Sequence, residues 1–87
     1  MVLDEAEQTV GGAVYREQGD QTVFLDGVVV VQALAERGIA GAILQDFSTR
    51  MTSLGFRMIK THFFLRRFYE KHGFRLDQRL GSLVRNL

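Results

Sequence analysis

The chain has 87 residues, is 46% hydrophobic and carries a net charge of +1, with two histidines and no cysteine. The lack of cysteine excludes disulfide bonds, thiolate metal sites and a cysteine nucleophile, and two histidines are too few for a zinc site without carboxylates. No apolar run approaches the roughly 20 residues that span a bilayer, and no secretory signal pattern is present. We therefore expect one small cytoplasmic domain without a metal or a membrane partner.

The charges are divided unevenly along the chain. Residues 1–46 contain eight acidic and two basic side chains, a net charge of −6, whereas residues 47–87 contain nine basic and two acidic ones, a net charge of +7. A basic half either forms a solvated face or attracts an anion, such as a phosphorylated cofactor or nucleic acid. Because its aromatic residues fall at core spacing and the overall charge is low, we do not expect a nucleic-acid partner.

The first half of the chain predicts a β-hairpin. Residues 9–16 and 22–31 are rich in strand-forming residues, and residues 18–20 between them are typical of a turn. Residues 28–31 are four valines, so this stretch is apolar on both faces. We expect it to be a central strand that is covered on both sides.

The second half predicts two helices and two strands. Apolar residues recur at three- and four-residue steps through residues 39–54, which is typical of an amphipathic helix, and Gly55 follows where a C-terminal cap belongs. Residues 57–63 predict a strand, residues 65–71 a short helix and residues 74–80 a last strand. The order β-β-α-β-α-β predicts an α+β fold, a curved mixed sheet with helices packed against it.

The junction between the valine strand and the first helix has the features of a phosphate site. Gly38 and Gly41 leave the backbone accessible to a ligand. The first N–H groups of a helix have no partner inside it and lie at its positive dipole end. This junction predicts a phosphorylated cofactor.

A second motif lies in the short helix, where Phe68 and Tyr69 precede Gly73 and Phe74 in the pattern F-Y-x-x-x-G-F. In this order, the two motifs resemble those of the GNAT N-acetyltransferase superfamily, and the resemblance extends over residues 8–80.

The family's cofactor motif, R/Q-x-x-G-x-G/A, aligns with residues 35–40. Gly38 and Ala40 match it, whereas Ala35 replaces its first, long polar residue. Glu36 would bring a negative side chain near the phosphates. These two departures are expected to weaken the affinity for the cofactor.

The resemblance implies acetyl-CoA as the cofactor. In the family, the cofactor strand separates from its parallel neighbour, and its N–H groups bond the pantetheine arm and the thioester oxygen; Val29, Val30 and Val31 would do so here. The pyrophosphate would lie on the backbone where the helix begins. The residues concerned are Arg37, Gly38, Ile39, Ala40, Gly41 and Ala42.

The resemblance also assigns catalytic residues. Tyr69 matches the family's tyrosine near the coenzyme sulfur, and a phenol, protonated at neutral pH, can donate to the departing thiolate. Asp26 is a candidate general base, and His62 is either a second candidate or a structural histidine. The family often has asparagine at the position of His62 and alanine at that of Leu65, so no role transfers directly there. His72 is expected to cap its helix.

The resemblance therefore implies an acetyl-CoA-dependent N-acetyltransferase in which a primary amine, of a small molecule or a peptide, attacks the thioester directly. The alternative is a non-catalytic coenzyme A-binding or protein-interaction module, which the changes at Ala35 and Glu36 favour. Family members usually carry a further strand and two helices before the hairpin, which form one wall of the acceptor groove. We accordingly expect exposed apolar surface that a homodimer or a partner subunit covers.

Overall fold

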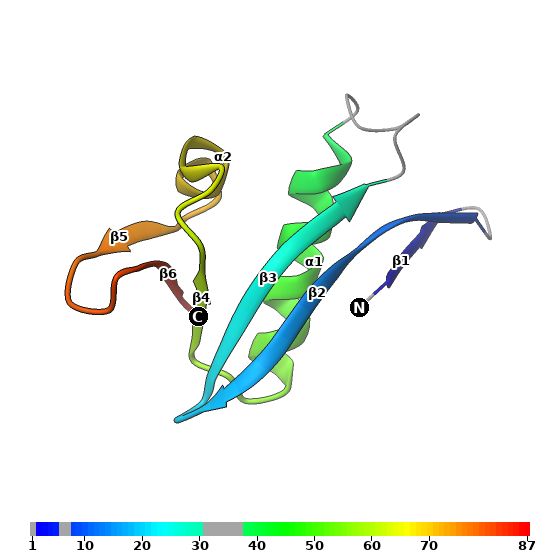
Figure 1. Ribbon diagram of the computed structural model, residues 1–87. Helices are drawn as coiled ribbons and strands as arrows, with labels where there is room; N and C mark the ends of the chain where they lie inside the picture. The colour runs from blue at the N-terminus through cyan, green and yellow to red at the C-terminus, as the bar shows by residue number, and fades with distance from the viewer. Residues whose placement is uncertain (1, 6–7, 31–37) are drawn as a thin grey trace.

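The computed structural model describes residues 2–5, 8–30 and 38–87, with side chains from residue 11 onward. The elements are β1 (Val2–Glu5), β2 (Gln8–Gly19), β3 (Thr22–Val30), α1 (Ile39–Ser53), β4 (Met58–Thr61), α2 (Arg66–Lys71), β5 (Arg75–Asp77) and β6 (Ser82–Asn86) (Figure 1). The strands form one sheet in the order β1-β2-β3-β4-β6-β5. Only β3 and β4 run parallel, and all other neighbours are antiparallel. The α+β class with a mixed sheet is confirmed.

The predicted order of elements is wrong at both ends of the chain. β1 pairs with β2 ahead of the hairpin, although its four residues, two of them acidic, carry no periodic signal. The predicted strand 74–80 is interrupted after Asp77, whose carboxylate accepts hydrogen bonds from the N–H groups of Arg79 and Leu80 at 3.0 and 3.1 Å. A carboxylate that satisfies two backbone donors stabilises a turn, and β6 begins after it.

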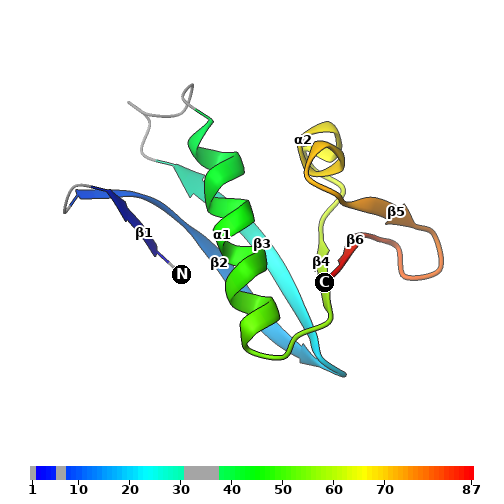
Figure 2. The same cartoon turned by 180° about the vertical axis from the view of Figure 1, so that it is seen from behind.

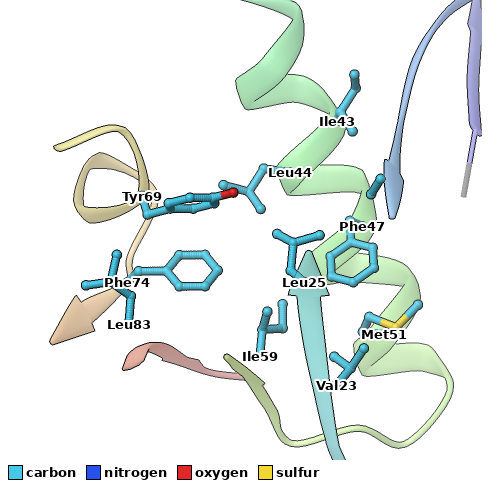
Figure 3. Packing of buried hydrophobic residues seen from close by; sticks show 11 residues of the cluster. Val23, Leu25, Ile43, Leu44, Phe47, Met51, Ile59, Tyr69, Phe74 and Leu83 are labelled. Carbon is cyan, nitrogen blue, oxygen red and sulfur yellow. The ribbon is translucent and has the colours of Figure 1, made fainter. Parts of the chain in front are cut away.

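The helix α1 lies across β2 and β3 (Figure 2). Its predicted apolar stripe is confirmed in Ile43, Phe47 and Met51, which are buried, and Gly55, with φ of 92°, follows its end. The short helix α2 adds Tyr69 to the same core cluster, beside Leu44 of α1 (Figure 3). The other members shown are Val23, Leu25, Ile59, Phe74 and Leu83. Both helices thus pack on one face of the sheet.

The opposite face of the sheet, which we call the open face, carries Val14, Arg16, Phe24 and Val29. No helix within the described ranges covers it, and Val14 and Val29 are exposed. The prediction of a strand covered on both sides is therefore wrong for Val29, because both helices contribute side chains to the same core on the other face.

Candidate active site

The strands β3 and β4 separate halfway along β3. β3 pairs with β2 as far as Val30, but its pairing with β4 ends at Leu25, opposite Thr61 (Figure 1). There the Thr61 hydroxyl donates a hydrogen bond of 2.8 Å to the Leu25 carbonyl, and the chain then leaves the sheet toward α2. The edge of β3 beyond this point has no strand partner on the β4 side within the described residues, so its backbone groups can bond a ligand.

A β-bulge marks the point of separation. Tyr15 pairs with Leu25 but Val14 pairs with Gly27, which leaves Asp26 as an extra residue of β3. A bulge interrupts the alternation of side chains and re-aims the residues that follow. Here the core-facing residues change from Val23 and Leu25 to Val28 and Val30.

A pocket of about 130 Å³ lies where the two strands separate. It brings together Asp26 from the bulge, His62 from the end of β4 and Tyr69 from α2. The remaining lining residues are Gly27, Val28, Thr61, Phe64 and Leu65. The two residues assigned from the resemblance as acid and base, and the second candidate base, thus line one pocket.

Tyr69 presents its hydroxyl to this pocket from within the core. The residue is 5% exposed, and its ring packs against Phe74 at a centroid distance of 5.2 Å (Figure 3). The ring of Phe68 lies at the same centroid distance. The hydroxyl makes no hydrogen bond to any described residue, and no fully buried polar side-chain atom in the described part of the chain lacks a partner. The phenol oxygen therefore lies open to the pocket, where it can donate a proton.

Asp26 and His62 form a polar cluster on the open face. The Oδ1 atom of Asp26 lies 3.6 Å from Nη2 of Arg16 and 3.9 Å from Nε2 of His62. The ring of Phe24 supports the cluster, because the Arg16 guanidinium lies 4.9 Å from its centroid and the His62 ring meets it edge-on at 4.8 Å. The pocket thus places a carboxylate and an imidazole beside the unpaired edge of β3.

The helix α1 begins with free backbone donors. Gly38 is its N-cap with φ of 70°, and no side chain caps the helix. The first hydrogen bond of the helix runs from the Ala42 N–H to the Gly38 carbonyl, so the N–H groups of Ile39, Ala40 and Gly41 precede the helical ladder. The first turn contains no acidic side chain. This helix start is a suitable environment for a phosphate.

Part of the predicted cofactor site lies outside the described residues, namely Val31 and Arg37, as do Ala35 and Glu36. Of the other predicted positions on β3, Val29 is exposed and Val30 is half-buried.

Gly41 has a role that the sequence did not indicate. A Cβ at this position would lie 2.8 Å from Cε1 of His72, so the missing side chain lets α1 pack against the end of α2. The sequence pattern also gave no role to Thr61 or Phe64, since only the ending of β4 brings them to the pocket.

Comparison with known proteins identifies the family. The family model described as an acetyltransferase (GNAT) domain matches residues 1–76. The chain belongs to the GNAT acetyltransferase family. The comparison with curated proteins gives no match.

Similar solved structures support the fold. An acetyltransferase from Bacillus cereus aligns with a TM-score of 0.76 and 19% identity, over 100% of this chain and 71% of its own. Tetrahymena GCN5 aligns with a TM-score of 0.80 and 18% identity, over 99% and 66%. A GNAT family acetyltransferase from Elizabethkingia anophelis, with acetyl-CoA bound, aligns with a TM-score of 0.84 and 15% identity, over 99% and 74%. This chain thus spans about two thirds to three quarters of these proteins.

The described residues contain neither a membrane-spanning helix nor a metal-binding cluster. None of their helices is long and apolar enough to cross a membrane. Nor do these residues contain a group of three or more histidine, cysteine, aspartate or glutamate side chains that could hold a metal ion.

Proposed function

We propose that this protein is an acetyl-CoA-dependent N-acetyltransferase that transfers an acetyl group to a primary amine. The observation that carries the proposal is the pocket at the separation of β3 and β4, in which Tyr69, Asp26 and His62 meet beside unpaired backbone. Membership of the GNAT family and the similarity to a structure with acetyl-CoA bound support the choice of cofactor.

The helix start fits the pyrophosphate of the cofactor. A Cβ at Gly38 would meet nothing within 4 Å, and the N–H groups of Ile39, Ala40 and Gly41 lie before the helical ladder. A dianionic group gains from such donors because no carboxylate stands in the first turn to repel it. When bound, acetyl-CoA supplies the acetyl thioester.

The residues of the pocket then divide the proton transfers. The pair of Asp26 and His62 takes the proton that the amine loses as its nitrogen forms the new N–C bond. The Tyr69 hydroxyl gives its proton to the sulfur as the C–S bond breaks. The backbone groups at Val29 and Val30 alternate between the two edges of β3, and those that face the unpaired edge would hold the thioester end. The amine attacks directly, since the chain has no cysteine to carry an acyl group.

Exposed apolar side chains on the open face are an argument for a second copy of the chain as a partner. Val14 and Val29 are exposed there, beside the cluster of Asp26 and His62. We propose a homodimer that covers this face and completes the acceptor groove. Light scattering on the purified chain tests this, and the mass of a single chain at micromolar concentration would contradict it.

Binding of acetyl-CoA, measured by isothermal titration calorimetry, is the first test of the function. We expect saturable binding to the wild type and an affinity reduced by about tenfold or more in Gly38→Asp, which corresponds to about 1.4 kcal/mol of repulsion. Gly38→Asn is the matched control, because its side chain has the same shape, tolerates positive φ equally and carries no charge. Equal losses in both variants would contradict a pyrophosphate at this position, and no binding to the wild type would overturn the proposal.

Turnover distinguishes the enzyme from a non-catalytic coenzyme A-binding module. Release of coenzyme A can be followed with a thiol reagent, and the protein gives no background because it contains no cysteine. Alkylamines, amino acids and lysine peptides are tested as acceptors. Saturable binding without turnover on any of them would favour the module.

A further inference from the structure

We infer that His62 accepts the amine proton and that Asp26 is a positioning residue that orients the His62 ring. This inference rests on the proposed acetyltransferase function and resolves a choice that the sequence leaves open. Three titratable side chains line the pocket: Asp26, His62 and Tyr69. Since Tyr69 serves the departing sulfur, the proton of the amine goes to one of the other two.

The carboxylate of Asp26 is engaged on two sides. Arg16 lies 3.6 Å away and is itself held by its contact with the ring of Phe24. On the other side lies Nε2 of His62, 3.9 Å from the same carboxylate oxygen. A carboxylate between a guanidinium and an imidazole is placed to orient its neighbours.

The imidazole of His62 is held mainly by contacts with aromatic rings. Its side chain is 46% exposed and its ring lies between two aromatic rings, edge-on to Phe24 at 4.8 Å and tilted against Phe64 at 6.0 Å. Neither ring nitrogen makes a hydrogen bond to a described residue. Because the side chain is half exposed, its ring nitrogens are accessible, while the two aromatic contacts hold the ring in place.

The nitrogen nearer to Asp26 is Nε2, 3.9 Å from Oδ1, so the negative charge of the carboxylate favours a proton on that nitrogen without a hydrogen bond. An N–H on Nε2 directed at the carboxylate leaves the lone pair on Nδ1. Nδ1 receives the proton of the amine as the nitrogen bonds the carbonyl carbon, and Asp26 stabilises the imidazolium that results. The proton from Tyr69 goes to the sulfur when the C–S bond breaks. One proton thus enters the pocket residues and one leaves them in each turnover.

Removal of the imidazole tests the assignment of His62. We expect turnover to fall by about 10²- to 10⁴-fold in His62→Asn and His62→Ala, the usual range for loss of a general base. The affinity for acetyl-CoA, measured by calorimetry, should stay within about twofold of the wild type, which corresponds to about 0.4 kcal/mol of binding free energy. The reason is that neither substitution removes a group proposed to hold the cofactor.

Added imidazole should restore part of the activity of His62→Ala, because it fits the vacated space and supplies the missing base. It should have no effect on the wild type or on Tyr69→Phe. Turnover of His62→Ala at the wild-type rate would overturn the inference. Absence of turnover in the wild type would instead count against the proposed function.

Magnetic resonance provides a readout that does not depend on activity. Long-range ¹H–¹⁵N spectra of the 87-residue chain report the tautomer of each histidine, and His72 serves as the internal reference. We expect the Nε2–H tautomer at His62, and a loss of this preference in Asp26→Ala. The matched control Glu17→Ala removes an exposed carboxylate of β2 and should change neither histidine.

The double variant separates positioning from direct catalysis. If Asp26 acts through His62, Asp26→Ala lowers kcat less than His62→Ala does, leaves KM nearly unchanged and adds no further loss in the double variant. A larger loss in Asp26→Ala than in His62→Ala would show that the carboxylate takes the proton itself. An unchanged tautomer in Asp26→Ala would equally overturn its positioning role.

Discussion

The two halves of β3 both pair with β2, but they differ in their other neighbour and in the exposure of their side chains. The inner half, residues 22–25, lies between β2 and β4, and its Val23 and Leu25 are fully buried. The outer half, residues 26–30, keeps β2 but has no partner on the β4 side, and its Val29 is 58% exposed. The outer half loses its second partner because β4 ends at Thr61, and the bulge at Asp26 in β3 changes which of its side chains face the core.

We expect the inner half to serve mainly stability and the outer half to serve mainly ligand binding. The inner half uses its side chains, which fill the core against α1. The outer half offers its backbone, at an edge that a neighbouring strand would otherwise occupy. Changes of side chain should therefore affect stability in the inner half, and changes of backbone position should affect ligand binding in the outer half.

The largest effect is expected for Leu25→Ala in the inner half. Leu25 is fully buried among core residues, and truncating such a side chain costs about 2–5 kcal/mol of unfolding free energy through lost burial and a residual cavity. Urea denaturation measures it, with Leu54→Ala as the matched control because Leu54 is exposed at the end of α1. Equal losses of unfolding free energy in Leu25→Ala and Leu54→Ala would contradict the role of the inner half of β3 in stability.

Gly11→Ala is expected to have the next largest effect, because it displaces the outer half itself. A Cβ at Gly11 would overlap the Val29 carbonyl oxygen and come within 2.5 Å of Cδ1 of Ile43. The backbone of β3 must then move, at a cost of about 1–3 kcal/mol. The affinity of the folded protein for acetyl-CoA should fall as well, in contrast to Leu25→Ala.

Gly27→Ala is the stability control for this prediction. It lies on the same half of β3, has ordinary φ, and a Cβ there meets nothing within 4 Å. A Gly11→Ala variant as stable as Gly27→Ala would show that the outer half adapts without cost.

The sequence predicted the parts of the fold that rest on local pattern. The apolar stripe through Ile43, Phe47 and Met51 indicated α1, and the strand-forming stretches on either side of residues 18–20 indicated the hairpin. Tyr69 was assigned by motif, and the structure places it in the lining of the pocket.

The rest of the fold and of the candidate site depends on contacts between residues that are distant in the sequence. The point where β4 ends, and hence the pocket, follows from the pairing of Thr61 with Leu25, which no local pattern encodes. The bulge at Asp26 is a mismatch of register between two strands. The need for glycine at Gly41 arises from the ring of His72 on another helix.

A smaller effect is expected at the boundary between the halves. Thr61→Val keeps the shape of the side chain but removes the hydroxyl that donates to the Leu25 carbonyl at 2.8 Å. The loss of one such hydrogen bond costs about 1 kcal/mol. Urea denaturation should show this cost in Thr61→Val and little of it in Thr61→Ser, which keeps the donor. A Thr61→Ser variant as unstable as Thr61→Val would assign the effect to packing.

The smallest effect is expected for Val29→Ala, which tests the comparison most directly. Val29 is 58% exposed on the open face, so its truncation should change the unfolding free energy by less than about 0.5 kcal/mol. The same substitution at the fully buried Val23 should cost at least about 1 kcal/mol. If the outer half binds acetyl-CoA through its backbone, calorimetry should also find an unchanged affinity in Val29→Ala. A weakened affinity in a fully stable Val29→Ala protein would mean that the valine side chain itself contacts the ligand. The outer half would then act through its side chains, as the inner half does in the core.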